Sequence, residues 1–513
     1  MLTFLNTLWF IRETKAVLFW IYLWQLKEYR FSRLLDHFHT EKGKNLLFNK
    51  LIFLKFILIL VFFIYPLYSP FILIILYSFE GAKALIDFFK KTLKKPVLTK
   101  KAVFLISVAL ILEISVILIL SQIFLFQEIT SGSWFAFWLL IFDILTPVIT
   151  SAIVILFQPL AILGRNQIIK RAIRKREQFK SLLVIGITGS YGKTSTKEFL
   201  YAILSEKFNV LKTKEHQNTE IGVSQCVLND LKPEHQIFIV EMGAYCRGEI
   251  KLLCDITKPK IGILTGINEQ HMATFGSLEN IIKGKYELIE SLPKDGIAFF
   301  NAQNKYCVEL YNKTTSIKKF LYGENVKIFG GENLLVAMAV AKELGMTEEE
   351  ISKAVEKIEN KLPGIQQKRG INGLIIFDAT YSANPDSVIG HLEYLKTLRQ
   401  AQGKLVVVMP CLIELGKATI EVHKRIGQKI GEVCNPVKEP DGSNGAGLAI
   451  ITTLDRFKEL KESAVEAGMR PENILFLENP KEILEKIKEF TRKGDIVLLE
   501  SRIPAKLISS LVG

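Results

Sequence analysis

The chain has 513 residues, of which 49% are hydrophobic and 23% are charged, and its mean hydropathy is +0.25. This composition excludes a disordered protein and is high for one that is soluble throughout its length. Lys and Arg (66) outnumber Asp and Glu (52), and three stretches, 27–50, 80–101 and 162–180, together carry the whole net charge of +14. Because each stretch flanks an apolar run, the excess charge indicates a membrane.

Two apolar runs, 102–126 and 134–163, are each longer than the ~20 residues needed to cross a bilayer. The link 127–133 contains no Lys or Arg, whereas both outer flanks are rich in them. We therefore expect a transmembrane hairpin with its tip outside and its ends in the cytoplasm. Glu113 and Asp143 lie inside these runs, and intramembrane carboxylates raise the question of function. Since neither run contains a basic residue, a hydrogen bond between helices or burial as the neutral acid is the favoured interpretation.

The two earlier apolar runs leave alternatives open. Residues 51–79 are interrupted by Pro66 and Pro70, so a broken or re-entrant segment is as consistent with the pattern as a full span. Residues 1–26 contain three charged residues near their middle and are consistent with either an interfacial helix or a span.

Residues Arg165–Lys180 (RNQIIKRAIRKREQFK) predict a basic amphipathic helix that follows the last apolar run. Such a helix is expected to lie against anionic lipid headgroups and to tether the following domain to the inner face of the membrane. No aromatic platform or helix-turn-helix pattern accompanies it, so nucleic acid is not an expected partner.

A phosphate-binding loop is predicted directly after this helix. Residues 182–187 (LLVIGI) read as a strand, and T-G-S-Y-G-K-T-S-T (188–196) reads as a glycine-rich turn that opens a helix. In such loops backbone N–H groups and the helix N-terminus bind phosphate, here with Lys193 reaching the β- and γ-phosphates and Thr194 ligating magnesium. Ile187 stands where the general pattern has its first glycine, so the motif is the variant T-G-x-x-G-K-T.

This variant loop resembles that of the Mur ligases, the enzymes that build the peptidoglycan stem peptide. Further segments that resemble the family follow in chain order: K-T-K-E-H-Q-N-T-E-I-G (212–222), E-M-G-A (241–244), L-T-G-I-N-E-Q-H-M-A-T-F-G-S-L-E-N (264–280), G-K-Y-E-L (284–288), F-N-A-Q-N (300–304) and D-A-T-Y-S-A-N-P-D-S (378–387). The last is similar to the corresponding segment of the D-alanyl-D-alanine-adding members. The resemblance covers about residues 181–513.

The resemblance implies roles for particular residues. Those implied to bind ATP are Gly189, Ser190, Tyr191, Gly192, Lys193, Thr194, Ser195, Asn301 and Asp378. Those implied in catalysis are Lys193, Glu241, His271 and Lys285. Those implied at the substrates are Thr213, Asn218, Asn384, Ser501 and Arg502.

The chemistry of such a ligase explains these residue types. A carboxylate is a poor acyl donor, so ATP first phosphorylates it, and an amine then attacks the acyl phosphate to give an amide, ADP and phosphate. Lys193 and a magnesium ion held by Thr194 and Glu241 would neutralise the transferring phosphoryl group. The resemblance implies a second Mg²⁺ at His271 and Lys285. A free ammonium cannot ligate a cation, and in the family this lysine is carbamylated, which makes it an anionic oxygen ligand.

The expected fold class is α/β: a P-loop Mur-ligase central domain plus a Rossmann-like C-terminal domain, preceded by a helical transmembrane region. Residues 1–180 are the transmembrane helices and the basic juxtamembrane helix. Residues 181–362 are the central ATP-binding domain, which ends near the Pro-Gly pair in 361–364. Residues 363–513 alternate strand and helix patterns, as a Rossmann-like domain does.

The chain departs from the family in several places. The membrane region stands where the family has a compact UDP-binding domain, so a lipid-linked acyl donor is an alternative to a soluble one. The hinge reads Pro363-Gly364-Ile365, which lacks the family's arginine unless Lys368 or Arg369 replaces it, and Ala379 replaces the second aspartate of a D-D pair. The ATP half therefore matches the family better than the amine-acceptor half.

We expect a multi-pass protein of the plasma membrane with cytoplasmic catalytic domains, acting as an ATP-dependent carboxylate–amine ligase that adds D-alanyl-D-alanine to a muramoyl peptide. One alternative is a ligase that makes another amide polymer, such as poly-γ-glutamate. A second is a non-catalytic ATP-binding scaffold for cell-wall synthesis. The six cysteines show no C-x-x-C pair and are expected to be buried, reduced thiols.

Overall fold

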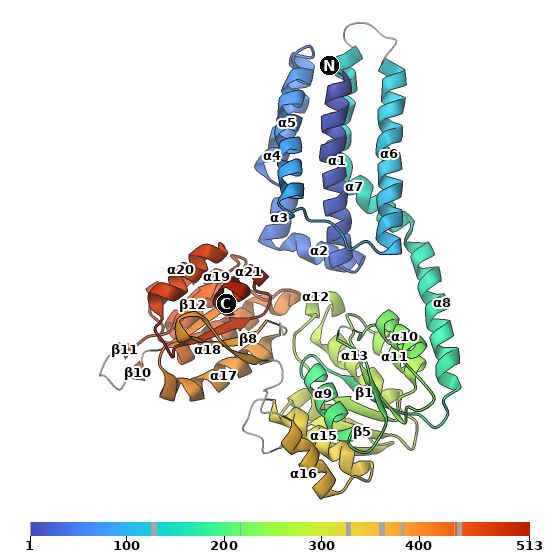
Figure 1. The fold of residues 1–513 in the computed structure, drawn as a ribbon, viewed down its shortest axis with the longest axis vertical. Helices are drawn as coiled ribbons and strands as arrows, with labels where there is room; N and C mark the ends of the chain where they lie inside the picture. The colour runs from blue at the N-terminus through green and yellow to red at the C-terminus, as the bar shows by residue number, and fades with distance from the viewer. Residues whose placement is uncertain are drawn as a thin grey trace. The chain divides into compact units, whose positions relative to one another are not determined.

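The computed structural model describes residues 2–124, 131–215, 217–324, 330–358, 365–380, 384–435, 437–438 and 444–512. The chain divides into two compact units, Met1–Arg165 and Asn166–Gly513 (Figure 1). The first is all helical, and the second is built on two six-stranded β-sheets, one parallel and one parallel except for an edge strand.

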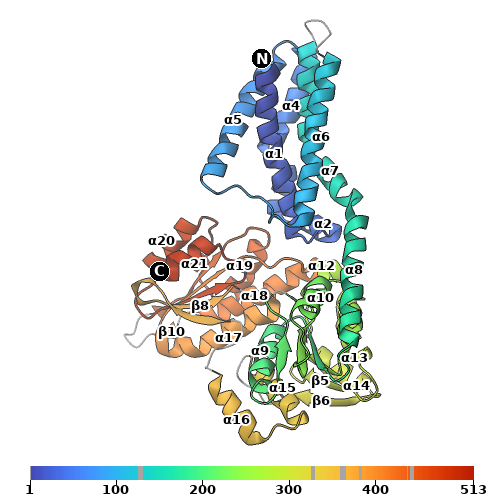
Figure 2. The same ribbon diagram turned by 45° about the vertical axis from the view of Figure 1, so that its right-hand side comes forward.

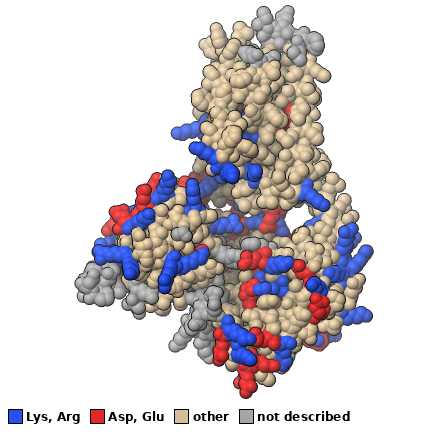
Figure 3. Space-filling model, viewed as in Figure 1, with Lys and Arg blue, Asp and Glu red and all other residues tan. Residues whose placement is uncertain are grey.

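The first unit is a bundle of long helices. Its elements are α1 (Leu2–Leu26), α2 (Phe31–His39), α3 (Glu41–Leu47), α4 (Lys50–Ile64), α5 (Ser69–Phe89), α6 (Lys100–Phe124) and α7 (Ser131–Leu156). Figures 1 and 2 both show α1, α4, α5, α6 and α7 running side by side with the shorter α2 at one end, and Figure 1 shows α3 at that end as well. On the face drawn in Figure 3 the bundle is largely uncharged, and Lys and Arg gather toward that same end.

Among the described residues, three helical segments are long and apolar enough to cross a membrane: Glu41–Ile64, Lys100–Phe124 and Gly132–Glu177. The last two contain the helices expected for the hairpin; residues 125–130 at its tip lie outside the described residues. Residues 51–79 are interrupted, as the alternative of a broken segment predicts. They belong to the two helices α4 and α5, because Pro66 lies in the turn between them and Pro70 occupies the first turn of α5, where proline is tolerated.

Asp143 contradicts the favoured interpretation of a neutral or simply hydrogen-bonded acid. Its carboxylate is paired with Arg12 of α1 and, at 2.8 Å, with Lys55 of α4. The sequence reasoning failed because it looked for a base within the same span, whereas the bases come from other helices. Glu113 is buried and has no hydrogen-bond partner among the described residues.

The basic helix is α8 (Gln158–Glu177), and its apolar face is used differently from the expectation. Ile169 and Ala172 are buried in the hydrophobic core of the second unit, so this face packs on protein and not on lipid. Arg176 is also buried and donates to three backbone carbonyls, those of Thr257 (2.8 Å), Phe179 (2.8 Å) and Leu182 (3.1 Å). Lys170, Arg171 and Arg174 remain exposed.

The first sheet of the second unit is wholly parallel, in the order β2-β3-β1-β4-β5-β6. Its strands are β1 (Leu183–Thr188), β2 (Val210–Lys212), β3 (Ile237–Glu241), β4 (Ile261–Leu264), β5 (Ile297–Asn301) and β6 (Lys318–Tyr322). The helices around it are α9 (Lys193–Leu204), α10 (Glu220–Asn229), α11 (Glu249–Thr257), α12 (Met272–Phe275), α13 (Leu278–Glu290), α14 (Lys305–Lys313), α15 (Gly331–Glu343) and α16 (Glu348–Lys357). Both faces are covered: α8, α10, α11, α13 and α14 pack on one, and α9, α15 and α16 on the other. This explains why the strands read as continuous apolar runs.

The second sheet has the order β13-β12-β9-β14-β8-β7 and is parallel except for the edge strand β7. Its strands are β7 (Gln366–Arg369), β8 (Ile375–Ala379), β9 (Leu405–Met409), β12 (Leu448–Ile451), β13 (Ile474–Phe476) and β14 (Ile496–Glu500), and β10 (Val437–Lys438) pairs with β11 (Asn444–Gly445) separately. The helices are α17 (Pro385–Gln402), α18 (Thr419–Cys434), α19 (Phe457–Glu466), α20 (Pro480–Phe490) and α21 (Ala505–Val512). The predicted alternation of strands and helices is present throughout, whereas β7 and α21 were not predicted.

Two sequence expectations concern details of this unit. The expected domain boundary at 361–364 lies outside the described residues, as do 381–383 of the D-A-T-Y motif. All six cysteines are free thiols, but Cys246 is exposed, so the expectation of six buried thiols is wrong at that position. Cys246 follows the end of β3 in a surface loop, which is why no core covers it.

Candidate active site

The predicted phosphate loop lies between the carboxyl end of β1 and the start of α9, and its backbone requires glycine. Gly192 has a φ of 77°, and a Cβ there would lie 2.6 Å from Oδ1 of Asn333. A Cβ on Gly189 would lie 2.1 Å from Oγ1 of Thr265. Any side chain at either position would therefore push apart the turn that aims the N-terminus of α9 at a bound anion.

Lys193 and Thr194 open helix α9 directly after this turn. Without a nucleotide, the Lys193 ammonium folds back and donates to the carbonyl of Gly189 at 2.6 Å, so it already lies over the loop that would hold phosphate. Burial lowers the pKa of Lys193, although the nearby Glu241 carboxylate opposes that shift. A phosphate in the loop would give this ammonium an anionic partner in place of a neutral carbonyl.

Glu241, the last residue of β3, is held by neighbours on both of its oxygens. Oε2 accepts from the Thr194 hydroxyl at 3.0 Å and lies 3.4 Å from the Lys197 ammonium, while Oε1 accepts from the Asn218 amide at 3.1 Å. The Thr213 hydroxyl accepts from the Glu241 backbone N–H at 3.1 Å. The sequence-predicted residues 194, 213, 218 and 241 are thus brought together at one sheet edge.

A magnesium ion fits the Thr194–Glu241 pair by donor type. Magnesium prefers oxygen ligands and is commonly bound by one or two carboxylates together with substrate phosphates. A hydroxyl and a carboxylate in mutual contact beside a phosphate loop supply that set. Among the described residues there is no group of three or more His, Cys, Asp or Glu placed to hold a metal. Water and substrate phosphates commonly complete the coordination of magnesium at such a site.

His271 follows β4 and is held in a left-handed conformation with a φ of 65°. Its Nδ1 lies 2.7 Å from the Glu414 carboxylate, and its ring packs edge-on against Tyr245 at a centroid distance of 4.6 Å. Burial lowers the pKa of His271, and Glu414 opposes that shift. Because Glu414 occupies Nδ1, the other ring nitrogen is the one available as a ligand.

Lys285 lies on α13 and is almost completely buried. Burial, aided by the positive charge of Lys193, lowers the pKa of its amine to about 7. Lys285 and Lys193 in turn both lower the pKa of His271, so the three side chains lie within reach of one another's charge. An amine with this pKa is largely neutral at slightly alkaline pH and can attack carbon dioxide, as carbamylation requires.

The residues predicted to lie beside the adenine form hydrogen bonds with neighbouring loop residues. The side-chain amide of Asn301 donates to the carbonyl of Thr265 at 2.7 Å, and its oxygen accepts from the backbone N–H of Gln303 at 2.9 Å. Tyr191 is largely buried, and its hydroxyl accepts from Asn304 at 3.2 Å. Ser190 and Ser195 lie in the loop and in the first turn of α9. Contact between Asn301 and a nucleotide stays a prediction.

The second sheet presents its predicted residues at the carboxyl ends of β8 and β14. Asp378 on β8 accepts from the Lys368 ammonium at 2.6 Å, which keeps its pKa below the usual range despite partial burial. Lys368 is therefore already paired, which argues against its replacing the missing hinge arginine. Ser501 follows β14, and its N–H donates to the carbonyl of Ala379 at 3.3 Å; Arg502 beside it is exposed.

Asn384 caps helix α17, where its side-chain oxygen accepts from the backbone N–H of Ser387 at 2.9 Å. The Asn268 amide lies 3.4 Å from that oxygen and donates to Asp386 at 2.7 Å. Glu269 is paired with Arg425 at 3.1 Å. Side chains after β4 therefore meet side chains of the second sheet's helices, as Glu414 meets His271.

Sequence reasoning missed Lys197, Asn268 and Glu414. Lys197 lies one helical turn after Lys193 on α9, a spacing that places it on the same face of the helix and could have indicated a second cation near the loop. Asn268 stands within the segment 264–280 that resembles the family, and Glu414 lies in the loop that follows β9. Their contacts join separate strands, and no local spacing encodes such pairings.

Residues 187–366 match the family described as the Mur ligase middle domain. The chain is 33% identical over 282 residues to the UDP-N-acetylmuramoyl-tripeptide–D-alanyl-D-alanine ligase of Synechocystis sp., an alignment covering 50% of this chain and 60% of the relative. The chain thus spans about 60% of the length of that relative.

Two solved structures are similar in fold. The structure of MurF from Acinetobacter baumannii aligns with a TM-score of 0.57 at 23% identity, covering 68% of this chain and 80% of that one. The MurF ligase from Thermotoga maritima, solved in complex with ADP, aligns with a TM-score of 0.54 at 24% identity, covering 67% and 83%. At these identities the likeness shows the fold of the two α/β domains.

Proposed function

We propose that this chain, whose residues 187–366 are a Mur ligase middle domain, is an ATP-dependent ligase that joins a carboxylate to an amine through an acyl phosphate. The observation that carries the proposal is the convergence of Lys193, Glu241, His271 and Lys285, from four separate elements, at the carboxyl edge of one sheet. Ligands of open α/β sheets bind at that edge.

In the proposed reaction a carboxylate oxygen of the acyl substrate attacks the γ-phosphorus of ATP, and ADP leaves. Lys193 positions the phosphates and balances their charge, and the turn at Gly189 and Gly192 provides backbone N–H donors. Magnesium, held by Thr194 and Glu241, would neutralise charge on the transferred group. The amine then attacks the acyl carbon, loses a proton and expels phosphate to leave the amide.

The same pocket suits a second magnesium ion once Lys285 is carbamylated. The neutral amine nitrogen of Lys285 would form a bond to the carbon of carbon dioxide and release one proton to solvent. The resulting carbamate would offer two oxygens as ligands in place of a nitrogen that would otherwise be protonated. Glu414 fixes the His271 ring so that its free nitrogen can join them.

The proposed substrates are a muramoyl peptide and D-alanyl-D-alanine in peptidoglycan precursor synthesis. The printed name of the Synechocystis relative supports both substrates, and the ADP in the Thermotoga maritima neighbour supports the nucleotide. The name of the Synechocystis relative supports a UDP-linked acyl donor. A lipid-linked acyl donor is supported only by the presence of the helical unit in this chain.

We place the helical unit in the plasma membrane and the ligase in the cytoplasm. Besides the three candidate spans, helices α1 and α5 have 25 and 21 residues, enough to cross a bilayer. They contain three charged residues each, but Arg12, Glu13 and Glu80 are paired inside the bundle, so none of these three is an unpaired buried charge. The basic stretches 27–50 and 80–101 would then face the cytoplasm.

The test uses the full-length protein purified in a mild detergent, with ATP, magnesium, UDP-N-acetylmuramoyl-tripeptide and D-alanyl-D-alanine. Phosphate release and the amide product are measured together, and the proposal expects both to require both substrates. Lys193→Ala should abolish turnover, whereas Lys207→Ala, which removes an exposed lysine paired with Glu350, should retain it. Release that requires glutamate instead would identify an amide-polymer ligase, and nucleotide binding without release would identify a scaffold.

A further inference from the structure

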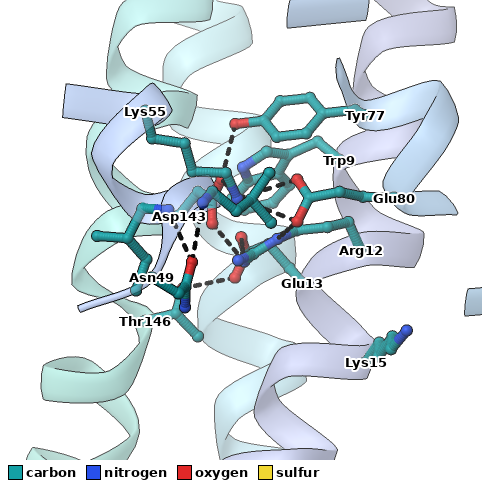
Figure 4. A network of polar contacts seen from close by, with 12 residues as sticks. Trp9, Arg12, Glu13, Lys15, Asn49, Lys55, Tyr77, Glu80, Asp143 and Thr146 are labelled. Carbon is teal, nitrogen blue, oxygen red and sulfur yellow. Dashed lines mark hydrogen bonds and ion pairs between the residues drawn. The ribbon is translucent and has the colours of Figure 1, made fainter. Parts of the chain in front are cut away.

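The helical unit contains a cluster of charged side chains drawn from four helices (Figure 4). Arg12 and Glu13 belong to α1, Lys55 to α4, Glu80 to α5 and Asp143 to α7. The carboxyl groups of residues 13 and 143 and the Lys55 ammonium are almost completely buried. We refer to these five side chains as the charge cluster.

The five side chains of the charge cluster are joined to one another by ion pairs. Lys55 lies 2.9 Å from Glu80 and 2.8 Å from Asp143, and Arg12 lies 2.5 Å from Glu13 and 3.5 Å from Glu80 as well as contacting Asp143. The hydroxyls of Tyr77 and Thr146 donate to Asp143 (3.1 Å) and Glu13 (2.5 Å). Burying this many charges is costly even when they are paired, and in a membrane such residues are a functional hypothesis by default.

A cavity of about 480 Å³ adjoins the charge cluster. Arg12, Lys55 and Asp143 line its inner part, whereas Lys83 and Lys94 line its exposed rim. The volume is typical of a small-molecule site. The lining residues of the charge cluster are buried or partly buried and ion-paired, whereas Lys83 and Lys94 are exposed, so the cavity opens to the surface near these two lysines, at the basic end of the bundle.

The lining of the cavity carries an excess of positive charge. Five lysine or arginine side chains stand against three carboxylates, which leaves a formal charge of +2. Lys15 is neutralised by Asp87 at 2.7 Å, and the cluster satisfies Lys55 and Arg12. Within the described part of the chain, Lys83 and Lys94 have no ion-pair partner, so the uncommitted positive charge is at the rim.

The remaining lining is largely apolar and includes Phe19, Trp20 and Ile52. An inorganic anion would gain nothing from contact with these apolar side chains, and a metal cation would be repelled by the excess of positive charge. A ligand that suits both features has a doubly negative head and a hydrocarbon tail.

We propose that this cavity binds the phosphate-monoester headgroup of a membrane lipid, with Lys83 and Lys94 neutralising the phosphate and the apolar walls receiving the first carbons of the chain. The two rim lysines lie in the basic stretch 80–101, which the positive-inside bias places at the cytoplasmic headgroup level. The inference rests on the membrane insertion proposed above and is independent of the ligase activity.

The test measures lipid binding to the full-length protein in a neutral detergent by native mass spectrometry. Phosphatidic acid, whose phosphate is a monoester, is compared with phosphatidylcholine, and inorganic phosphate is added as a competitor. The wild-type protein is expected to hold one phosphatidic acid at least tenfold more tightly than phosphatidylcholine. The variant Lys83→Gln/Lys94→Gln should bind it about tenfold or more weakly, since each basic residue near a charged lipid surface contributes appreciably.

The matched control is Lys90→Gln/Lys95→Gln, which removes two exposed charges of the same region that do not line the cavity. This control should bind within about twofold of wild type. Equal losses in the two variants would overturn the proposal in favour of general surface attraction, and equal binding of the two lipids would overturn it as well. Full competition by inorganic phosphate would show a free-anion site. Extraction of the protein from cell membranes by alkaline carbonate would refute membrane insertion without bearing on the ligase.

Discussion

The reactivity of Lys285 offers the sharpest test of the catalytic site. Burial and the charge of Lys193 lower its pKa from 10.5 to about 7. At pH 7 about half of the Lys285 amine is therefore neutral. An amine with the ordinary pKa of 10.5 would have a neutral fraction of only about 1 in 3,000, which is about 1,600-fold smaller. Since only the neutral amine attacks carbon dioxide, carbamylation of Lys285 should be half-maximal near pH 7 and close to complete by about pH 8 at saturating bicarbonate.

The measurement is trapping of the carbamate with an alkylating oxonium reagent, followed by peptide mass spectrometry of the full-length protein at pH values from 6 to 9. Lys283 serves as the internal control, because it lies on the same helix but is exposed and paired with Glu279 at 2.5 Å. Lys193→Met should move the Lys285 transition to higher pH, since it removes a repelling charge. A Lys285 that reacts only near pH 10, or no more than Lys283, would refute the reasoning.

Three further predictions follow from contacts described above. Gly192→Ala should lower the free energy of unfolding by about 2 kcal/mol or more and abolish nucleotide binding. The control Gly345→Ala has the same φ of 77° but open space around its Cβ, so it should cost only about 1 kcal/mol and leave nucleotide binding intact. Chemical denaturation measures the stability of both variants, and a fluorescent ATP analogue measures their nucleotide binding. Arg176→Gln removes the hydrogen bonds to two buried carbonyls and one partly buried carbonyl, and it should lower the free energy of unfolding by about 2–4 kcal/mol in chemical denaturation. Arg174→Gln, at an exposed position, should lower it by no more than about 0.5 kcal/mol. Thr194→Val should raise the magnesium concentration needed for half-maximal phosphate release by about tenfold, and an unchanged requirement would remove this hydroxyl from the metal site.

Local patterns were enough to predict most of the α/β unit. The apolar runs that became β1, β3 and β9 needed no tertiary information, because strands covered on both faces must be apolar along their whole length. The phosphate loop was equally readable, since glycines and a lysine at fixed spacing act locally. The positions of Glu241 and Lys193 near one another followed from the rule that the ends of parallel strands share an edge.

Pairings between distant elements were not readable in the same way. The contact of Glu414 with His271 spans 143 residues, and that of Glu13 with Thr146 spans 133. The charge state of Asp143 was wrongly predicted for this reason, because the basic residues that pair with it are far away in sequence and no nearby residue indicates them. The apolar face of α8 was misassigned because amphipathicity predicts only that a face is covered, not whether lipid or protein covers it.

The scattering of the charge cluster over α1, α4, α5 and α7 has a consequence for how the protein is made. Arg12 and Glu13 leave the ribosome about 130 residues before Asp143, which at 5–20 residues per second is a delay of about 6–26 s. In the membrane insertion proposed above, the first helix would carry charges without their later partners during that time, and its release into the hydrocarbon would be unfavourable. The first helix should therefore wait beside the insertion machinery and partition into the bilayer only as part of an assembled set, so that biogenesis of this domain ends in one concerted step.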